Sequence, residues 1–184
     1  MPTFNSPHFE MVLTYWRSVA TNGAPSPREF DFVEIPAALP DIIFWELHDD
    51  GKIICRMAGT GVISRMKTDI TGIDIRAAMP DDPGFDVLED FRATQALPCA
   101  IYHVAHNQHP SGKIARVETL TLPIAPDRRS LPKFVCVNHM IETVGYDNND
   151  KLDGLKFAKE LEDRRFIDVG WGVPSVQNLN QHVS

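Results

Sequence analysis

The sequence predicts an α+β domain in which a five-stranded antiparallel sheet carries helices on one face, with an N-terminal helix and a C-terminal extension added. Two apolar segments, 42–47 and 52–58, are typical of strands, and Asp49-Asp50-Gly51 between them is typical of a hairpin turn. Three longer strand-like segments come later in the chain: 99–106, 113–124 and 133–143. The helical segment 59–98 separates the second strand from the third, and this order favours one antiparallel sheet with helices packed on it.

The bulk composition indicates one globular domain and excludes some partners. The chain has 184 residues, of which 43% are hydrophobic and 23% are charged, so we expect one core with extensions. We divide it into residues 1–40 (N-terminal helix and lead-in), 41–145 (core) and 146–184 (C-terminal extension with a helix). The formal net charge of −7 argues against nucleic acid as a partner. Without a signal-peptide pattern or an apolar run of roughly 20 residues, we expect no membrane span and a soluble cytoplasmic protein.

The N-terminal helix is predicted over residues 7–21. Ser6-Pro7 is a helix-start signal, and Asn22-Gly23 is a helix-stop signal. Five apolar residues recur at helical spacing: Phe9, Val12, Leu13, Trp16 and Ala20. Because this apolar face can serve either the core or a second copy of the chain, we expect a homodimer built partly by this helix.

The remaining helices are predicted from weaker signals. Residues 24–40 contain four prolines and should wrap over the surface, and residues 62–78 should form short helical turns and loops. Asp82-Pro83 is expected to open a longer helix that Pro98 ends. In the C-terminal extension, apolar residues at helical spacing predict an amphipathic helix over 153–165.

The motifs that usually carry catalysis are missing from the sequence. Gly59-Thr60-Gly61 lacks the further glycine of a dinucleotide loop and the Gly-Lys-Ser/Thr end of a P-loop. No serine stands in a G-x-S-x-G elbow. Cys55, Cys99 and Cys136 lie in apolar runs without C-x-x-C spacing, so we expect buried reduced thiols. We therefore expect no enzyme.

Three histidines follow one another in the third strand and the turn after it. His103 and His106 should point to opposite faces of the sheet, and His109 falls in the turn. They cannot easily converge on one ion, so we predict no metal site and interpret them as surface or edge residues.

Several short sequence motifs resemble those of a family of bacterial PAS proteins. Four segments carry the likeness: Arg56-Met57-Ala58-Gly59-Thr60, Asp69-Ile70-Thr71-Gly72, the lead-in 27–31 with Leu39-Pro40, and Glu118-Thr119-Leu120-Thr121-Leu122-Pro123-Ile124. The resemblance extends over residues 9–146. It implies a PAS fold and a sensory or regulatory role. A haem-binding member should carry a histidine in the helical middle region, and a flavin photosensor a cysteine there. Residues 60–98 contain neither, so any cofactor stays unknown.

Polar residues in otherwise apolar strands are the candidate ligand-binding residues. Five residues form this set: Arg56, Thr60, Glu118, Asn138 and His139. A buried charge must be paired or bound, so we predict that Glu118 holds Arg56, or that Arg56 awaits an anionic ligand. The alternative is that these side chains face solvent or pair with one another.

The leading hypothesis is a non-enzymatic PAS-type sensor that binds a small molecule, a protein partner, or both. With 184 residues the chain has no room for a kinase, cyclase or DNA-binding segment beside this domain, so its output should pass to a separate protein. The alternative is a pure dimerisation module whose cavity is filled by side chains. An enzyme is the third possibility.

Overall fold

The computed structural model describes residues 3–81, 83–128, 130–147 and 154–175. Its elements, in chain order, are α1 (Phe9–Val19), the 3-10 turns η1 (Phe32–Glu34) and η2 (Leu39–Asp41), β1 (Ile42–Leu47), β2 (Ile53–Ala58), α2 (Thr60–Met66), η3 (Ile75–Ala78), α3 (Val87–Ala96), β3 (Cys99–Gln108), β4 (Lys113–Ile124), β5 (Lys133–Tyr146) and β6 (Lys156–Asp168). Within the described ranges, none of the helices is long and apolar enough to cross a membrane.

The strands form one sheet in the order β2-β1-β5-β4-β3-β6, and every neighbouring pair is antiparallel. The predicted hairpin of β1 and β2 is confirmed, and so is the insertion of the helical segment between β2 and β3. The predicted number of strands was wrong, because the sheet has six strands and not five.

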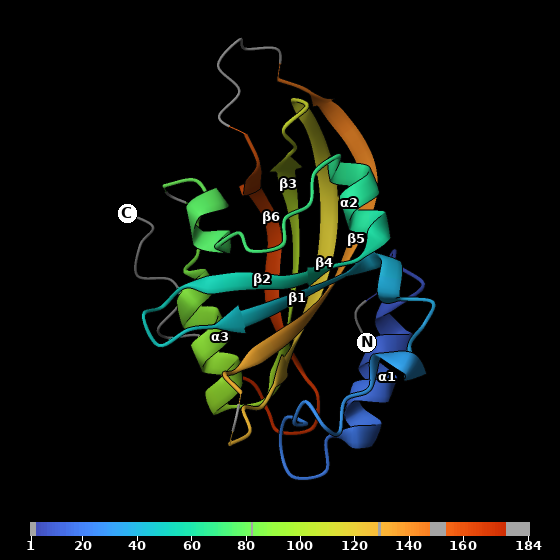
Figure 1. The fold of residues 1–184 in the computed structure, drawn as a ribbon, viewed down its shortest axis with the longest axis vertical. Helices are drawn as coiled ribbons and strands as arrows, with labels where there is room; N and C mark the ends of the chain where they lie inside the picture. Colours follow the sequence, from blue (N-terminus) through green and yellow to red (C-terminus); the bar gives the residue numbers. More distant parts are fainter. Residues whose placement is uncertain (1–2, 82, 129, 148–153, 176–184) are drawn as a thin grey trace.

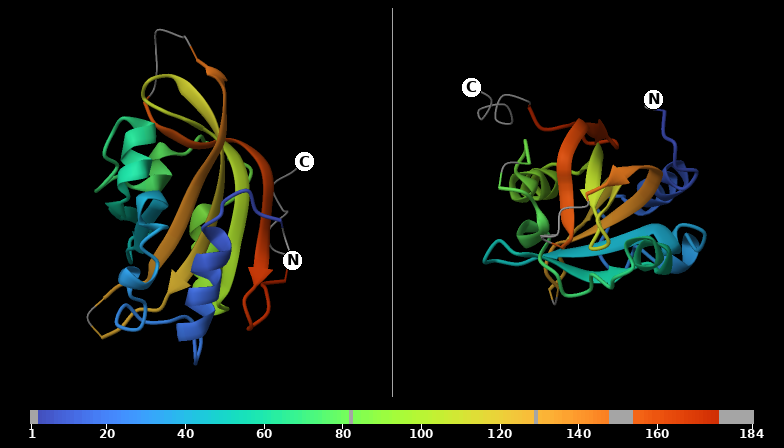
Figure 2. Two further views of the ribbon diagram at one scale, coloured as in Figure 1. Left: turned by 90° about the vertical axis from the view of Figure 1, so that its right-hand side faces the viewer. Right: turned by 90° about the horizontal axis from the view of Figure 1, so that it is seen from above.

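Alternating side chains give the sheet two buried faces. On one face, which we call the inner face, Ile43 and Trp45 of β1 pack in a cluster with residues of α2 and α3. On the other, the outer face, Ile42 lies in a second cluster with residues of α1. Figures 1 and 2 show α1 and α3 on opposite sides of the long strands. Both faces of the sheet therefore carry helices, and the N-terminal helix is the one that covers the outer face.

The helix α1 buries its predicted apolar face in its own domain. Phe9, Val12, Leu13 and Trp16 are all buried, and Trp16 Nε1 donates a 2.8 Å hydrogen bond to the carbonyl oxygen of Pro123 in β4. The face thus serves the core. The homodimer stays a prediction, but this helix no longer supports it.

The C-terminal helix predicted over 153–165 was wrong, because Lys156–Asp168 forms the strand β6. β6 pairs along β3, with Ile101 opposite Phe166 and His103 opposite Arg164. This pairing satisfies the backbone groups of what would otherwise be the free edge of β3. A tertiary contact therefore overrides the local helix pattern.

The helix α3 starts later than predicted. Its N-cap is Asp86, whose carboxylate accepts a 2.9 Å hydrogen bond from the backbone N–H of Leu88. The predicted cap Asp82 lies outside the described residues. Residues 83–86 are consequently a loop, and the Phe85 ring in it lies 6.1 Å from the His103 ring on the inner face of the sheet.

Candidate ligand-binding site

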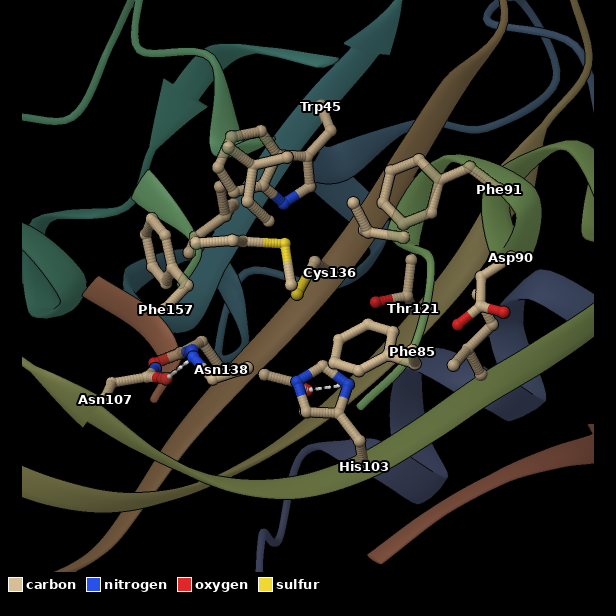
Figure 3. Close-up of a pocket in the computed structure, with 17 residues that line it drawn as sticks. Trp45, Phe85, Asp90, Phe91, His103, Asn107, Thr121, Cys136, Asn138 and Phe157 are labelled. Atoms are coloured by element: carbon tan, nitrogen blue, oxygen red, sulfur yellow. Dashed lines mark hydrogen bonds between the residues drawn. The ribbon is translucent and has the colours of Figure 1, made fainter. Parts of the chain in front are cut away.

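A cavity lies between the inner face of the sheet and the inserted helical segment. Its walls are mostly apolar and include Trp45, Met79, Phe85, Phe91 and Phe157. The free space inside amounts to about 50 Å³. One buried water needs roughly 10–15 Å³ on this measure, so the cavity can take a few waters or a compact ligand. Figure 3 shows the aromatic rings distributed around this space.

Three polar side chains cross the floor of this cavity in a row. His103 of β3 lies opposite Thr119 of β4, and Thr119 lies opposite Asn138 of β5. All three line the cavity. We call these three residues the polar row. Cross-strand partners on one face lie next to each other, so the row is a built feature of the sheet and not three separate surface residues.

The imidazole of His103 is neutral near pH 7. Burial and the nearby Arg164 guanidinium lower the pKa of His103 to about 4. Thr119 Oγ1 lies 2.6 Å from Nε2 and 2.9 Å from Nδ1 of the ring. This hydroxyl therefore hydrogen-bonds an uncharged ring, and the tautomer decides which group donates.

The side chain of Asn138 is the third member of the polar row. The residue is only 4% exposed, and its backbone oxygen accepts a 2.9 Å hydrogen bond from Arg65 Nη2. Its side-chain amide borders the cavity and makes no hydrogen bond to the residues that the structure describes. Because the amide faces the free space of the cavity, water or a bound molecule can hydrogen-bond to it.

The cavity also contacts a buried ion pair. Asp90 of α3 lines the cavity and is 1% exposed. Its Oδ2 accepts a 2.7 Å hydrogen bond from Arg164 Nε, and its Oδ1 accepts a second from Arg164 Nη2. Burial raises the pKa of Asp90, and these bonds oppose the rise only in part. The pair ties α3 to β6, and both carboxylate oxygens are already engaged.

The five predicted ligand-binding residues do not come together in the structure. Asn138 alone of the five lines the cavity. Thr60 is exposed at the start of α2. His139 follows Asn138 and stands opposite Glu118 in register, which places its side chain on the outer face.

The predicted pair of Arg56 and Glu118 was wrong. The strands β1 and β5 lie between β2, which carries Arg56, and β4, which carries Glu118. The Arg56 side chain is 56% exposed, and its Nε lies 3.8 Å from Glu46 Oε1. An exposed arginine keeps its hydration and needs no buried acceptor.

Glu118 instead anchors the start of the chain. It is fully buried on the outer face, where it accepts hydrogen bonds from the backbone N–H and the side-chain amide of Asn5, both 3.2 Å, from the backbone N–H of Ser6, and from the Tyr102 hydroxyl at 3.1 Å. These donors satisfy the carboxylate without a cation.

The cysteines behave as predicted. All three are buried and free. Cys136 lines the cavity, but burial raises the pKa of its thiol to about 11. The thiol is therefore protonated near pH 7 and is a poor nucleophile.

Sequence reasoning missed most of the polar groups at the cavity. His103 was interpreted as a surface or edge residue, and Thr119, Asp90 and Arg164 were not singled out. A usable signal was present in the fourth strand, where Thr119 and Thr121 alternate with Leu120 and Leu122. With both faces of a strand buried, such alternation indicates a polar site on one face.

Comparisons with known proteins agree with this geometry at the level of the family. No curated protein matches the chain. A family model described as PAS domain matches residues 4–137. The match runs from the segment before α1 into β5, and it includes every element of the inserted helical segment. The chain therefore belongs to the PAS domain family.

Proposed function

We propose that this PAS domain is a sensory or regulatory domain that binds a small molecule in the cavity on the inner face of its sheet. PAS domains are generally sensory and non-catalytic, which fits such a role. The observation that carries the proposal is the Asn138 amide, which faces the cavity and makes no hydrogen bond to the described residues. Apolar walls with a few convergent polar groups are the usual composition of a small-molecule site.

The connections of Asn138 offer a route for the signal. Arg65, near the end of α2, donates from Nη2 to the Asn138 backbone oxygen and from Nη1 to Asp41 Oδ1 at 2.6 Å. The Arg65 backbone oxygen accepts a 3.1 Å hydrogen bond from Lys113 Nζ in β4. A ligand that draws the Asn138 amide toward itself would favour one position of β5 against α2, and a separate output protein would bind that arrangement better.

The alternative is a protein-interaction module whose cavity has no ligand. The small free volume favours it, because about 50 Å³ can also be filled by water. In that case Asn138 bonds to water and the domain acts through its surfaces alone. Homodimerisation through such a surface remains a prediction.

The two functions differ in whether compounds stabilise the protein. Native mass spectrometry of the freshly purified protein reports bound molecules, and melting scans against a fragment library report compounds that raise the Tm. A sensor should give at least one compound that raises the Tm of the parent protein and of the exposed control Arg56→Gln, but not that of Asn138→Leu. If no bound molecule is found and no fragment shifts the Tm, the sensor proposal fails and the interaction module stands.

A further inference from the structure

The walls of the cavity carry no cation for an acidic ligand. Among the described residues that line it, Asp90 is the single charged group, and neither a lysine nor an arginine is present. A carboxylate or phosphate placed here would lose its hydration without gaining a counter-charge, and it would lie near another anion. Burial of an unpaired charge is among the most costly changes a protein can make.

A cationic ligand also lacks a free partner. Asp90 could attract it, but both of its oxygens already accept hydrogen bonds from Arg164. A ligand cation would have to displace a guanidinium that is held on two atoms and that lies over the Phe85 and Phe166 rings, at 5.6 Å and 5.1 Å from their centroids. Such a bidentate pair is stronger than a single contact. The cavity therefore disfavours charge of either sign.

The uncharged groups of the polar row are well suited to a ligand that both donates and accepts hydrogen bonds. The Asn138 amide offers two N–H donors and a carbonyl acceptor on one planar group. Thr119 lies beside it in register with a hydroxyl. A planar group with the complementary donor and acceptor can bond Asn138 twice, as a second amide does.

The shape of the cavity favours a ligand whose remaining part, beyond the group that bonds to Asn138, is flat and apolar. The Phe85 ring lies 6.1 Å from the His103 ring at 39°, and the Trp45 ring lies 6.0 Å from the Phe157 ring at 85°. Figure 3 shows Phe85 near His103, with Phe157 and Trp45 on other sides of the space. Aromatic rings on several sides and a small free volume accommodate one ring better than a long chain or a large ring system.

From the charge, hydrogen-bonding and shape of these groups we infer that the cavity selects a small, planar, uncharged ring compound that carries a hydrogen-bond donor beside an acceptor, as a primary aromatic amide does. Asn138 is the residue that determines this specificity, with Thr119 beside it. The inference rests on the proposed function, because it names the chemical class of the ligand for the same cavity.

Three probes of nearly equal shape test the inference: benzamide is neutral, benzoate is an anion, and benzamidine is a cation at pH 7.5. Titrations followed by protein NMR give the Kd of each. We expect benzamide to bind at least about tenfold more tightly than either charged probe, because a single uncompensated polar group already costs about that factor. Asn138→Leu should raise the Kd of benzamide by about tenfold or more, and the exposed control Arg56→Gln should leave this Kd unchanged.

The outcomes separate this inference from the proposed function. If benzoate or benzamidine binds as tightly as benzamide, and Asn138→Leu weakens it, the cavity binds ligands but the neutral class is wrong. The class is also wrong if none of the three probes binds while another fragment raises the Tm of the parent protein through Asn138. If no compound binds in the cavity, the inference and the proposed function both fail. Circular dichroism checks that the Asn138→Leu variant is folded. If this variant is unfolded, the Thr119→Val variant takes its place in the titrations.

Discussion

At the scale of single residues, Glu118 shows how a buried charge can be satisfied without an opposite charge. The sequence indicated correctly that an acid inside an apolar strand needs partners, but it suggested a cation. The structure supplies backbone N–H groups of Asn5 and Ser6 and the hydroxyl of Tyr102. Two of these donors precede α1, whose N-cap makes no side-chain hydrogen bond. The carboxylate therefore also lies near the positive end of this helix, where a negative charge is favourable.

Replacing this carboxylate should be costly even when the shape is kept. In Glu118→Gln, one oxygen becomes an NH₂ group that faces donors, so at least one hydrogen bond is lost and an unsatisfied group is left buried. We expect the free energy of unfolding to fall by about 1–3 kcal/mol, measured by urea denaturation. The matched control is Glu142→Gln on β5, where the side chain is 58% exposed; this variant should stay within about 0.5 kcal/mol of the parent. Equal stability of the two variants would contradict the anchoring role of Glu118.

The histidines of the interior predict a loss of stability in mild acid. Burial lowers the pKa of His103 and of His109 to about 4, whereas a histidine in an unfolded chain has a pKa of roughly 6.5. Between these values the unfolded chain binds a proton that the folded protein does not. Stability is therefore complete above pH 6.5 and falls as the pH drops toward 4.

From pH 7 to pH 5, each of these two histidines should remove up to about 2 kcal/mol. Urea denaturation at pH 7, 6 and 5 measures the loss in the parent protein and in His103→Gln, which keeps a polar group near Thr119 but does not titrate. Between pH 7 and pH 5, the free energy of unfolding of His103→Gln should fall less than that of the parent, by up to about 2 kcal/mol. Identical pH profiles for the two proteins would show that His103 is accessible to protons in the fold.

At the scale of helices and strands, the sequence predicted the elements whose determining signals lie within a short stretch of the chain. The β1–β2 hairpin has five residues between its strands, with Asp49-Asp50-Gly51 among them. The helix α1 has its start signal, its stop signal and its apolar face within residues 6–23. The strand β6 could not be found in this way, because what makes it a strand is the free edge of β3, whose paired residues lie 48 to 69 positions earlier. Its lysine, glutamate and leucine content favours a helix when it is considered alone.

A bulge in β6 shows how pairing with β3 constrains the backbone of β6. Ala158 has φ of 49°, in the left-handed region where a side chain is unfavourable. Asn107 of β3 holds the bulge, because its Oδ1 accepts a 2.8 Å hydrogen bond from the Ala158 N–H. Both residues border the cavity, so the bulge shapes the cavity as well as the sheet edge.

A substitution to glycine should preserve stability at position 158 in this bulge and reduce stability in a regular part of a strand. We expect Ala158→Gly to leave stability unchanged or to raise it by up to about 1 kcal/mol, since glycine adopts positive φ without steric cost. The control is Ala100→Gly in β3, a buried position in regular register with Ile167 and without positive φ, where a loss of about 1 kcal/mol or more is expected. Thermal melts compare the two variants with the parent. Equal losses would mean that the left-handed conformation of Ala158 is not strained.

At the scale of the whole molecule, the sequence predicted the class of the fold but little of the candidate site. The polar row exists because β3, β4 and β5 bring His103, Thr119 and Asn138 into register. A shift of one residue in either pairing would turn a member of this row to the other face. Only Asn138 stood out in the sequence, because it interrupts an apolar run. The other two needed the register, which depends on contacts that the local pattern does not contain.

The helix α1 should act as part of the domain core and not as a detachable dimer contact. Trp16 is fully buried in the outer-face cluster and bonds to the Pro123 carbonyl oxygen. Trp16→Ala would leave a large cavity and an unpaired carbonyl, so we expect a loss of about 3–5 kcal/mol in the free energy of unfolding. The control is Met11→Ala on the same helix, where the residue is 39% exposed and the loss should stay below about 1 kcal/mol. Urea denaturation measures stability, and light scattering of the folded protein at the same concentration measures its mass. A Trp16→Ala variant with parental stability but half the parental mass would show that this face binds a second copy and leaves the domain's own sheet uncovered.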